Sequence, residues 1–312
     1  MNFKQLKAFI GVAESGSLSK ASDRLRIGQP ALSHQMKLLQ DEIGVPLFTR
    51  HRRGMQLTEA GEALRDRVSG PIRQLEQARD DVRSAAGKPS GHMVLGILPS
   101  VSVVLARNLV HRISKELPGV SFRIVEGYTG HLVDWLQRGE VDAAILYGRE
   151  TVLHFPAEEL LVEDLAVVGP ADSSLNPKTA IRVSELSHLP LLLPSGLHGL
   201  RMLLESAATK AGVKLSARVE VDSFRLLTDL VENGQGFTTL PLSSIAQEIE
   251  QGRLKYAPLV QPQVTRRLIL GTAQGPRSHA TRMVIKVARQ EIAELVWRGV
   301  WRARLQFTPP RR

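Results

Sequence analysis

The sequence contains no cysteine. This excludes disulfide frameworks, thiolate zinc sites, cysteine-ligated iron–sulfur clusters and thiol catalysis. It also has no apolar run near the roughly 18 residues of a membrane-spanning helix, and its N-terminus lacks the apolar core and cleavage site of a secretory signal. We therefore expect a cytoplasmic protein that has no membrane partner.

Catalytic and cofactor motifs are missing as well. The sequence has no GxSxG, HExxH or P-loop motif, and its nine histidines form no cluster with metal-ligand spacing. Gly127 and Gly130 lack the third glycine of a dinucleotide fingerprint. We predict that the protein is not an enzyme and carries no metal or other cofactor.

The charge is unevenly distributed over a composition typical of a folded protein, with 43% hydrophobic and 23% charged residues. Residues 1–57 hold nine Lys/Arg against four Asp/Glu, residues 91–295 hold 21 of each, and residues 296–312 hold five Arg and no acid. The length of 312 residues suggests more than one domain. A basic module joined to a neutral one indicates a polyanion reader attached to a second function.

The basic module has the pattern of a winged helix-turn-helix. Apolar residues recur at helical spacing over residues 3–13, 18–25 and 30–42. Ser17 can cap the second helix, and Pro30 suits the first turn of the third. The last two helices are joined by a short turn, as in a helix-turn-helix. The basic stretch around Gly54, flanked by apolar residues, predicts a β-hairpin wing.

The third helix and the wing carry side chains suited to DNA. Gln and Ser at the start of such a helix can read base edges, and Lys and Arg neutralise phosphates. The candidate DNA-binding residues are Gln29, Pro30, Ser33, His34, Gln35, Lys37, Arg50, Arg52 and Arg53.

A long helix is predicted after the wing, capped by Thr58 and running about 28 residues. Its apolar positions alternate at four and three, which predicts a coiled-coil seam. The candidate dimerisation residues are Leu64, Val68, Leu75 and Val82. The alternative is a helix packed on its own domain. Pro71 lies within this seam and is expected to kink the helix.

From residue 92 onward, strand and helix patterns alternate. Strands are predicted near 93–98, 120–126, 141–146, 160–168, 189–193, 216–221, 236–240, 254–259 and 265–272, and helices at 101–117, 130–138, 198–211, 223–233, from 242 and at 279–297. This alternation predicts parallel sheets covered on both faces. About 200 residues of it imply two subdomains, with a ligand beyond the carboxyl ends of the strands.

The ends of these strands carry the candidate effector-binding residues, which are Ser100, Val101, Ser102, Thr129, Tyr147, Ser195, His198, Arg201, Ser223 and Thr238. The helix that begins near Ser100 favours an anion at its free amides, and His198 and Arg201 could add positive charge. We therefore expect a small anionic effector. The alternatives are that each Ser or Thr is an ordinary helix cap and that His198 and Arg201 are solvated.

Residues 31–62, ALSHQMKLLQDEIGVPLFTRHRRGMQLTEAGE, together with residues 9–25 and 29–33, resemble LysR-type transcriptional regulators. Two residues depart from that pattern. Gly28 stands where the family most often has Ser or Thr, and His34 stands where it most often has Arg. Residues 128–148 and 193–195 resemble the nitrogen assimilation control group within the family.

The resemblance implies the domain organisation. It implies a winged helix-turn-helix at 1–58, a linker and dimerisation helix at 59–87, a hinge at 88–91, an α/β effector domain at 92–300 and a basic tail at 301–312. The effector domain would comprise two Rossmann-like subdomains similar to periplasmic solute-binding proteins, one of 92–163 plus 267–300 and the other of 164–266. A homodimer through the linker helix, and a homotetramer as a dimer of dimers, are also implied.

The sequence thus predicts a transcriptional regulator that binds double-stranded promoter DNA under the control of a small effector. The alternative is a small-molecule-binding or enzymatic α/β domain whose helical module docks on protein. A steep salt dependence of DNA binding would distinguish the two, since phosphate neutralisation releases counterions.

Overall fold

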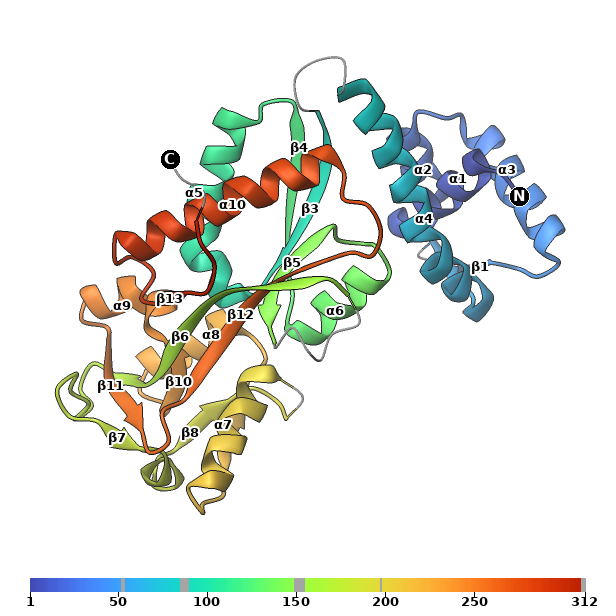
Figure 1. Cartoon of the computed structure of the whole chain (residues 1–312). Coiled ribbons are helices and arrows are strands. Elements are labelled where there is room, and N and C mark those ends of the chain that lie inside the picture. The colour runs from blue at the N-terminus through green and yellow to red at the C-terminus, as the bar shows by residue number, and fades with distance from the viewer. Residues whose placement is uncertain (52–53, 85–89, 149–154, 197, 310–312) are drawn as a thin grey trace. The chain divides into compact units, whose positions relative to one another are not determined.

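A computed structural model describes residues 1–51, 54–84, 90–148, 155–196 and 198–309. Met1–Gly87 form one compact unit, and most of the remaining chain forms the other (Figure 1). The predicted hinge residues 88 and 89 lie outside the described residues.

The first unit contains the predicted helices and hairpin. Its elements are α1 (Phe3–Ser15), α2 (Leu18–Leu25), α3 (Gln29–Ile43), β1 (Phe48–His51), β2 (Gly54–Leu57) and α4 (Glu59–Ser84). Ser17 caps α2 as predicted, and Asn2 and Gln5 form a capping box at the start of α1. Gly54 begins β2 at φ +131°, where an added Cβ would lie 2.3 Å from the Gly16 carbonyl oxygen. Only glycine therefore fits this turn.

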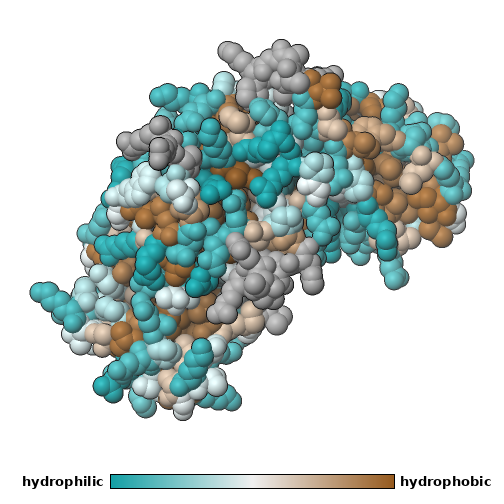
Figure 2. Space-filling view, in the orientation of Figure 1, coloured by the Kyte–Doolittle hydropathy of each residue, from teal (hydrophilic) through white to brown (hydrophobic). Residues whose placement is uncertain are grey.

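The helices of the first unit pack around one apolar core. Phe9, Leu32 and Leu39 are fully buried in it, and the Phe9 ring contacts the Phe48 ring of the wing at 5.3 Å between centroids. Apolar side chains also reach the surface of this unit on the face drawn in Figure 2.

Helix α4 continues through Pro71, and its first half belongs to this core. Val68 is only 9% exposed and Ile72 only 5%, whereas Leu75 is 59% and Val82 75% exposed. Leu64 packs against the same core. The assignment of Val68 to a dimer seam is therefore wrong, because its own domain covers it, whereas Leu64 is half-buried and its assignment stays a prediction.

The second unit alternates strands and helices as predicted. Its strands are β3 (Gly91–Ile97), β4 (Val120–Glu126), β5 (Ala143–Tyr147), β6 (Ala157–Pro170), β7 (Ile181–Arg182), β8 (Leu191–Leu193), β9 (Ala217–Glu220), β10 (Thr238–Pro241), β11 (Leu254–Val260), β12 (Thr265–Thr272) and β13 (Arg304–Leu305). Its helices are α5 (Pro99–Glu116), α6 (Thr129–Gln137), η2 (Val183–His188), α7 (Gly199–Lys210), α8 (Phe224–Glu232), η3 (Leu242–Ile245), α9 (Ala246–Glu250) and α10 (His279–Trp297).

The main sheet is mixed, so the prediction of parallel sheets is wrong in part. Strand β3 pairs in parallel with β4 and β5, but β12 runs antiparallel to β5 and β6. Strands β10 and β11 also run antiparallel to β6. The cause is that β6 carries the chain from one subdomain to the other and β12 carries it back (Figure 1). Strands that cross in opposite directions pair antiparallel.

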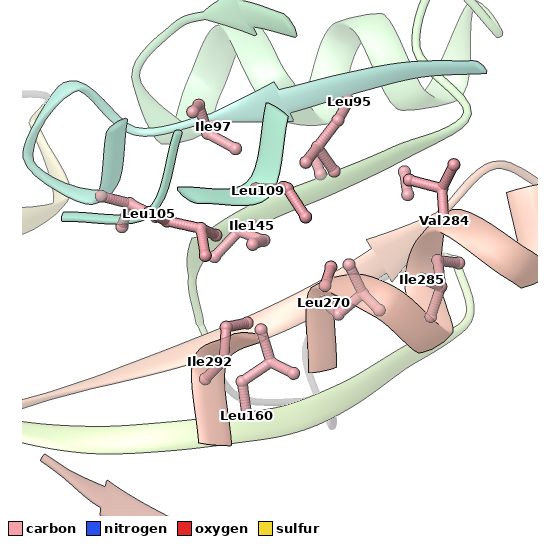
Figure 3. Packing of buried hydrophobic residues seen from close by; sticks show 14 of the residues in the cluster. Leu95, Ile97, Leu105, Leu109, Ile145, Leu160, Leu270, Val284, Ile285 and Ile292 are labelled. Carbon is pink, nitrogen blue, oxygen red and sulfur yellow. The ribbon is translucent and has the colours of Figure 1, made fainter. Parts of the chain in front are cut away.

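Two apolar clusters mark the two subdomains. In the first, α5 and α10 pack on the strands β3, β5, β6 and β12, and Figure 3 shows their side chains pointing toward one another. The residues labelled there are Leu95, Ile97, Leu105, Leu109, Ile145, Leu160, Leu270, Val284, Ile285 and Ile292. The second cluster lies among β8, α7, α8, β10 and β11. The boundaries at 163–164 and 266–267 stay a prediction.

The end of the chain is not a free basic tail. Trp301 is 1% exposed and belongs to the core of the first subdomain. Strand β13 pairs with β6, and Arg304 forms two hydrogen bonds of 3.1 Å with Asp164. The expectation of a basic tail at 301–312 is thus wrong for residues 301–309, because the apolar side chains of this segment pack against the domain. Residues 310–312 lie outside the described residues.

Among the residues that the structure describes, no helix combines the length and apolar character needed to cross a membrane.

Candidate functional site

The outer face of α3 presents the side chains predicted to read DNA. Leu32, Met36 and Leu39 form the buried face of this helix. The predicted contact residues Gln29, Pro30, His34 and Lys37 are exposed, and Ser33 and Gln35 are half-buried on its flanks. Since α3 buries a narrow apolar stripe, the opposite face is free for a partner.

The start of α3 is held by backbone rather than by a side-chain cap. Gly28 occupies the N-cap position without a side-chain hydrogen bond, and Pro30 lies in the first turn. The turn before it is fixed by Ser22, whose hydroxyl donates to the Ile27 carbonyl at 2.7 Å. Arg26 ends α2 in the left-handed region at φ 54°. This turn sets the angle at which α3 follows α2.

The wing is tied to α3 by Gln40. The Gln40 side-chain oxygen accepts hydrogen bonds from the backbone amides of Leu47 and Phe48, at 2.8 and 3.4 Å. Arg50 is exposed on β1, whereas Arg52 and Arg53 lie outside the described residues. Gln40 had not been predicted as a functional residue. A glutamine near the end of a helix gives no sequence signal that it holds the wing.

Leu75 and Val82 form the exposed apolar part of α4. They lie seven residues apart, which is one heptad, and therefore share a face of the helix. Of the predicted seam, these two residues are available to a partner helix.

A small cavity lies between the two subdomains of the second unit. It has a volume of about 30 Å³, the space of one or two water molecules. It is lined by Leu98, Pro99, Ser100, Tyr128, Tyr147, Pro194, His198, Leu200, Val221, Phe224, Leu227, Leu240 and Arg266. The Tyr128 hydroxyl donates to the Asp222 carbonyl oxygen and so links the subdomains at this point. Burial raises the pKa of the Tyr128 phenol, and the Asp222 carboxylate raises it further. It therefore stays a hydrogen-bond donor.

The cavity brings together three of the ten predicted effector residues, Ser100, Tyr147 and His198. Val101 is buried in the apolar core, and Ser102 and Ser195 are not among the lining residues. Thr129 also lies outside the lining, although its buried hydroxyl has no hydrogen-bond partner among the described residues.

The remaining predicted effector residues lie away from the cavity wall. Ser223 caps α8 through the Leu226 amide at 3.3 Å, and Thr238 is fully buried in β10. Arg201 forms an ion pair of 2.6 Å with Glu205 on the same helix. Arg201 is not among the residues that line the cavity, so its predicted positive charge there is not borne out by the lining, and a role in effector binding stays a prediction.

His198 is a neutral helix cap rather than a cation. Its Nδ1 accepts a hydrogen bond of 3.2 Å from the Leu200 amide, which requires an unprotonated Nδ1. Burial lowers the pKa of the His198 imidazole, the charge of Arg266 lowers it further, and Asp222 opposes this shift. The ring packs edge-on against the Tyr128 ring at 4.5 Å.

The positive charge at the cavity comes from Arg266 on β12, which had not been predicted. Its side chain is 1% exposed and forms an ion pair with Glu163 on β6. Its Nη1 donates to the Ser100 hydroxyl at 3.0 Å and to the Tyr147 hydroxyl. Burial disfavours this charge, but Glu163 and Tyr147 together raise the pKa of the guanidinium above its ordinary value.

The alternation of residues along β12 could have indicated from the sequence that Arg266 is buried. Val264, Arg266 and Leu268 follow one another at a period of two and are all buried. An arginine in phase with buried residues faces the interior, and it needs an acidic partner there. Tyr128 lies two residues after the end of β4 and so had the same strand-end position as the predicted residues.

Among the described residues, no group of three or more His, Cys, Asp or Glu side chains could hold a metal ion. Arg266 and the amide end of α5 are instead suited to an anion. Helix α5 has Leu98 at its N-cap position and no side-chain cap. Pro99 has no amide hydrogen, and the Val101 and Ser102 amides donate to the Leu98 carbonyl oxygen at 2.9 Å, so in this turn the Ser100 amide is the one that can add partial positive charge at the cavity.

Known families match both units. Residues 3–62 match the model of the bacterial regulatory helix-turn-helix protein, lysR family, and residues 86–293 match that of the LysR substrate binding domain. The nitrogen assimilation regulatory protein nac of Klebsiella aerogenes is 33% identical over 247 residues, 78% of this chain and 79% of that protein. The HTH-type transcriptional regulator BbuR of Bordetella bronchiseptica is 29% identical over 297 residues, 95% of this chain and 91% of that protein.

Solved structures share the fold of the whole chain. A full-length OxyR variant from Pseudomonas aeruginosa has a TM-score of 0.75 at 25% identity and covers 99% of both chains. Full-length CbnR complexed with its target DNA has a TM-score of 0.68 at 20% identity, covering 93% of this chain and 100% of that one.

Proposed function

The chain belongs to the LysR family of transcriptional regulators, and on this basis we propose how its two units work. The relatives described above are regulators and not enzymes, which agrees with the sequence prediction. The observation that carries the proposal is a buried arginine, Arg266, in the wall of a cavity between two subdomains. The protein is a DNA-binding regulator whose promoter binding responds to a small anion in that cavity. Because its target is promoter DNA, we place it in the cytoplasm.

Helix α3 enters the major groove. The exposed Gln29 and the half-buried Ser33 at its N-terminal end reach base edges, and Lys37 neutralises a phosphate. Gln40 holds the wing beside α3, so that Arg50 lies over the DNA backbone. At position 34 the family most often has Arg, whereas this chain has His34 and so lacks one permanent positive charge near the DNA. This lowers the electrostatic contribution to DNA affinity.

Two chains pair through the exposed apolar face of α4, and two such pairs form a tetramer. Leu75 and Val82 carry the contact, since Val68 is covered by its own domain. The change Leu75→Asp with Val82→Asp separates the helix-turn-helix heads, because charges are not tolerated in a coiled-coil seam. Light scattering at micromolar concentration should show that the tetramer of the parent is lost in favour of a smaller assembly, while circular dichroism shows the helix content of the parent. A monomeric parent would contradict the pairing.

The effector carries a carboxylate or a similar anionic group. Arg266, which is paired with Glu163, supplies a guanidinium in the cavity wall, and the Ser100 amide at the start of α5 adds partial positive charge. The apolar lining from Phe224, Leu227 and Leu240 selects a compact ligand with hydrocarbon character. A cavity of about 30 Å³ is too small for such a ligand. The ligand can enter only when the subdomains move apart by a hinge motion.

The experiment is a thermal-shift screen of small carboxylic acids, each matched with its amide. A ligand that binds only the folded protein raises the Tm, and we expect acids to do so where the corresponding amides do not. The hit is then tested against Ser100→Ala and, as a control, Ser17→Ala, which removes the cap of helix α2 in the first unit. Loss of the shift in the Ser100 variant alone supports the cavity. An equal response of acid and amide would contradict the anionic effector.

The same hit must change promoter binding. We expect the parent to show a ligand-dependent change in its DNA footprint, because the ligand shifts the subdomains relative to each other and so alters the spacing of the paired heads. A footprint that does not respond to a ligand of the cavity would separate ligand binding from regulation and contradict the coupling.

A further inference from the structure

The C-terminal segment, residues 299–309, connects both subdomains. Strand β13 pairs with Leu161 and Val162 of β6, on the side of the first subdomain. The backbone amide of Arg302 donates to the Ser243 hydroxyl at 2.7 Å, and Ser243 lies in η3 of the second subdomain. Besides the crossing strands β6 and β12, this segment is thus a further link between the two.

Trp301 anchors this segment at the crossing strands. Its ring is 1% exposed, and its indole Nε1 donates to Glu163 Oε2 at 3.0 Å. The other carboxylate oxygen of Glu163 accepts from Arg266. Glu163 therefore bonds to the C-terminal segment with one oxygen and to the cavity arginine with the other.

The chain of hydrogen bonds continues to the cavity wall. Arg266 donates to Ser100 and Tyr147, which both line the cavity. The Arg266 guanidinium also lies 4.9 Å from the centre of the Tyr147 ring. An uninterrupted series of contacts thus leads from the cavity through Arg266 and Glu163 to Trp301.

These groups cannot change their partners independently. Arg266 and Glu163 are both 1% exposed, and a buried charge that loses its partner is strongly disfavoured. In such a low-dielectric setting, hydrogen bonds along a series polarise and strengthen one another. A change in the bonds of Arg266 at the cavity must therefore shift Glu163, and Glu163 holds Trp301.

We propose that the C-terminal segment is a strap whose hold on the two subdomains depends on the hydrogen bonds that Arg266 makes at the cavity, with Glu163 and Trp301 as the positioning residues. It deepens the proposed function, since any anion that engages Arg266 would act on the strap. A ligand in the cavity would thus change how firmly the strap connects the two subdomains.

The test uses the full-length protein without any ligand. We expect trypsin to cleave after Arg302 and Arg304 when the strap opens, because the Arg302 amide is held by Ser243 and Arg304 lies in the paired strand β13. Mass spectrometry gives the rate at these two sites. Tyr147→Phe removes one hydrogen bond from Arg266 at the cavity, and we expect cleavage in the strap to become about tenfold faster. Ser100→Ala removes the neighbouring bond and should act in the same direction, which covers the case that one variant folds poorly.

Tyr256→Phe is the matched control. Tyr256 lies on β11 and is not among the residues that line the cavity, so strap cleavage should stay at the parent rate. Trp301→Phe is the positive control and should accelerate cleavage directly.

Two results would overturn the proposal. The strap only supports the fold if Trp301→Phe alone accelerates cleavage, and the effect is a general loosening of the domain if Tyr256→Phe acts as strongly as Tyr147→Phe. Because no effector is added, a failure of the anionic-effector screen leaves this measurement unaffected, and the two hypotheses fail separately.

Discussion

The outer face of α3 and the wall of the cavity, the two surfaces proposed to be functional, are built in opposite ways. On α3, one stretch of chain provides both the exposed side chains and, through Leu32, Met36 and Leu39, the buried face beneath them. The cavity wall collects side chains from both subdomains, and its charged group, Arg266, is itself part of the interior. DNA contacts can therefore change at little cost to folding, whereas changes at the cavity also change the stability of the domain.

The largest contrast is expected at Arg266. Arg266→Met leaves Glu163 buried without its partner, and we expect the free energy of unfolding to fall by about 3–5 kcal/mol. Lys37→Ala on the exposed face should stay within about 0.5 kcal/mol of the parent. Urea denaturation followed by circular dichroism measures both. Arg266→Met with Glu163→Leu should recover much of the loss, because the buried charge is then gone. Equal losses of unfolding free energy in Arg266→Met and Lys37→Ala would contradict the claim that, of the two surfaces, only the cavity wall is part of the folding core.

Helix α4 contains both kinds of position within one turn. Ile72 is buried in the core and Leu75 is exposed. Ile72→Ala should lower the unfolding free energy by about 2–5 kcal/mol at every protein concentration. Leu75→Ala should instead make the Tm fall with dilution, since it weakens the pairing of two chains. Thermal unfolding at two concentrations distinguishes these effects, and a concentration-independent Tm for both the parent and Leu75→Ala would contradict the pairing.

DNA affinity sharpens the comparison on the side of α3. Lys37→Ala should weaken binding to all sequences and reduce the slope of log affinity against log salt by about 0.9 for the lost phosphate contact. Gln29→Ala should leave that slope unchanged and relax the preference for the promoter sequence. Titrations at several salt concentrations, with promoter and unrelated DNA, measure both quantities. If both variants bind like the parent, α3 is not the reading helix.

The same contrast explains what could be predicted from the sequence. The helices, the wing and the exposed face of α3 follow from local periodicity, caps and turns, which a continuous stretch of residues displays. Strand ends likewise pointed to Ser100, Tyr147 and His198. Arg266 joins the cavity through the return strand β12, far along the chain from Ser100, so the pairing of strands had to be known first.

Two errors have related causes. The heptad pattern of α4 showed which residues share a face, but the pattern alone does not say what covers that face. Val68 is covered by its own domain and Leu75 is not. The C-terminal segment was interpreted from its arginines, whereas Trp301 and the pairing of β13 with β6 decide its place.

A smaller effect is expected from the pH dependence of the cavity. The pKa of His198 is lowered by burial in the folded protein, so below its ordinary value of about 6.5 the unfolded chain binds more protons than the native state. The contribution of neutral His198 to the free energy of unfolding is then fully present above about pH 6.5 and is lost as the pH falls. His198→Asn keeps an acceptor for the Leu200 amide and cannot titrate in this range. Its unfolding free energy should vary less than that of the parent between about pH 5 and 7.

The smallest effect is expected at Gly28, which begins α3. The position lacks a side-chain cap, its φ of −55° suits any residue, and an added Cβ would have only Pro30 Cδ nearby, at 4.0 Å. Gly28→Ser should therefore add a hydrogen bond to an amide of the first turn and stabilise the unit by a few tenths of a kcal/mol. Gly28→Ala tests whether the gain comes from the hydroxyl, since alanine restricts the unfolded chain but cannot cap. Chemical denaturation should rank the serine variant above the alanine variant, and the reverse order would show that the start of α3 is limited by backbone entropy rather than by its free amides.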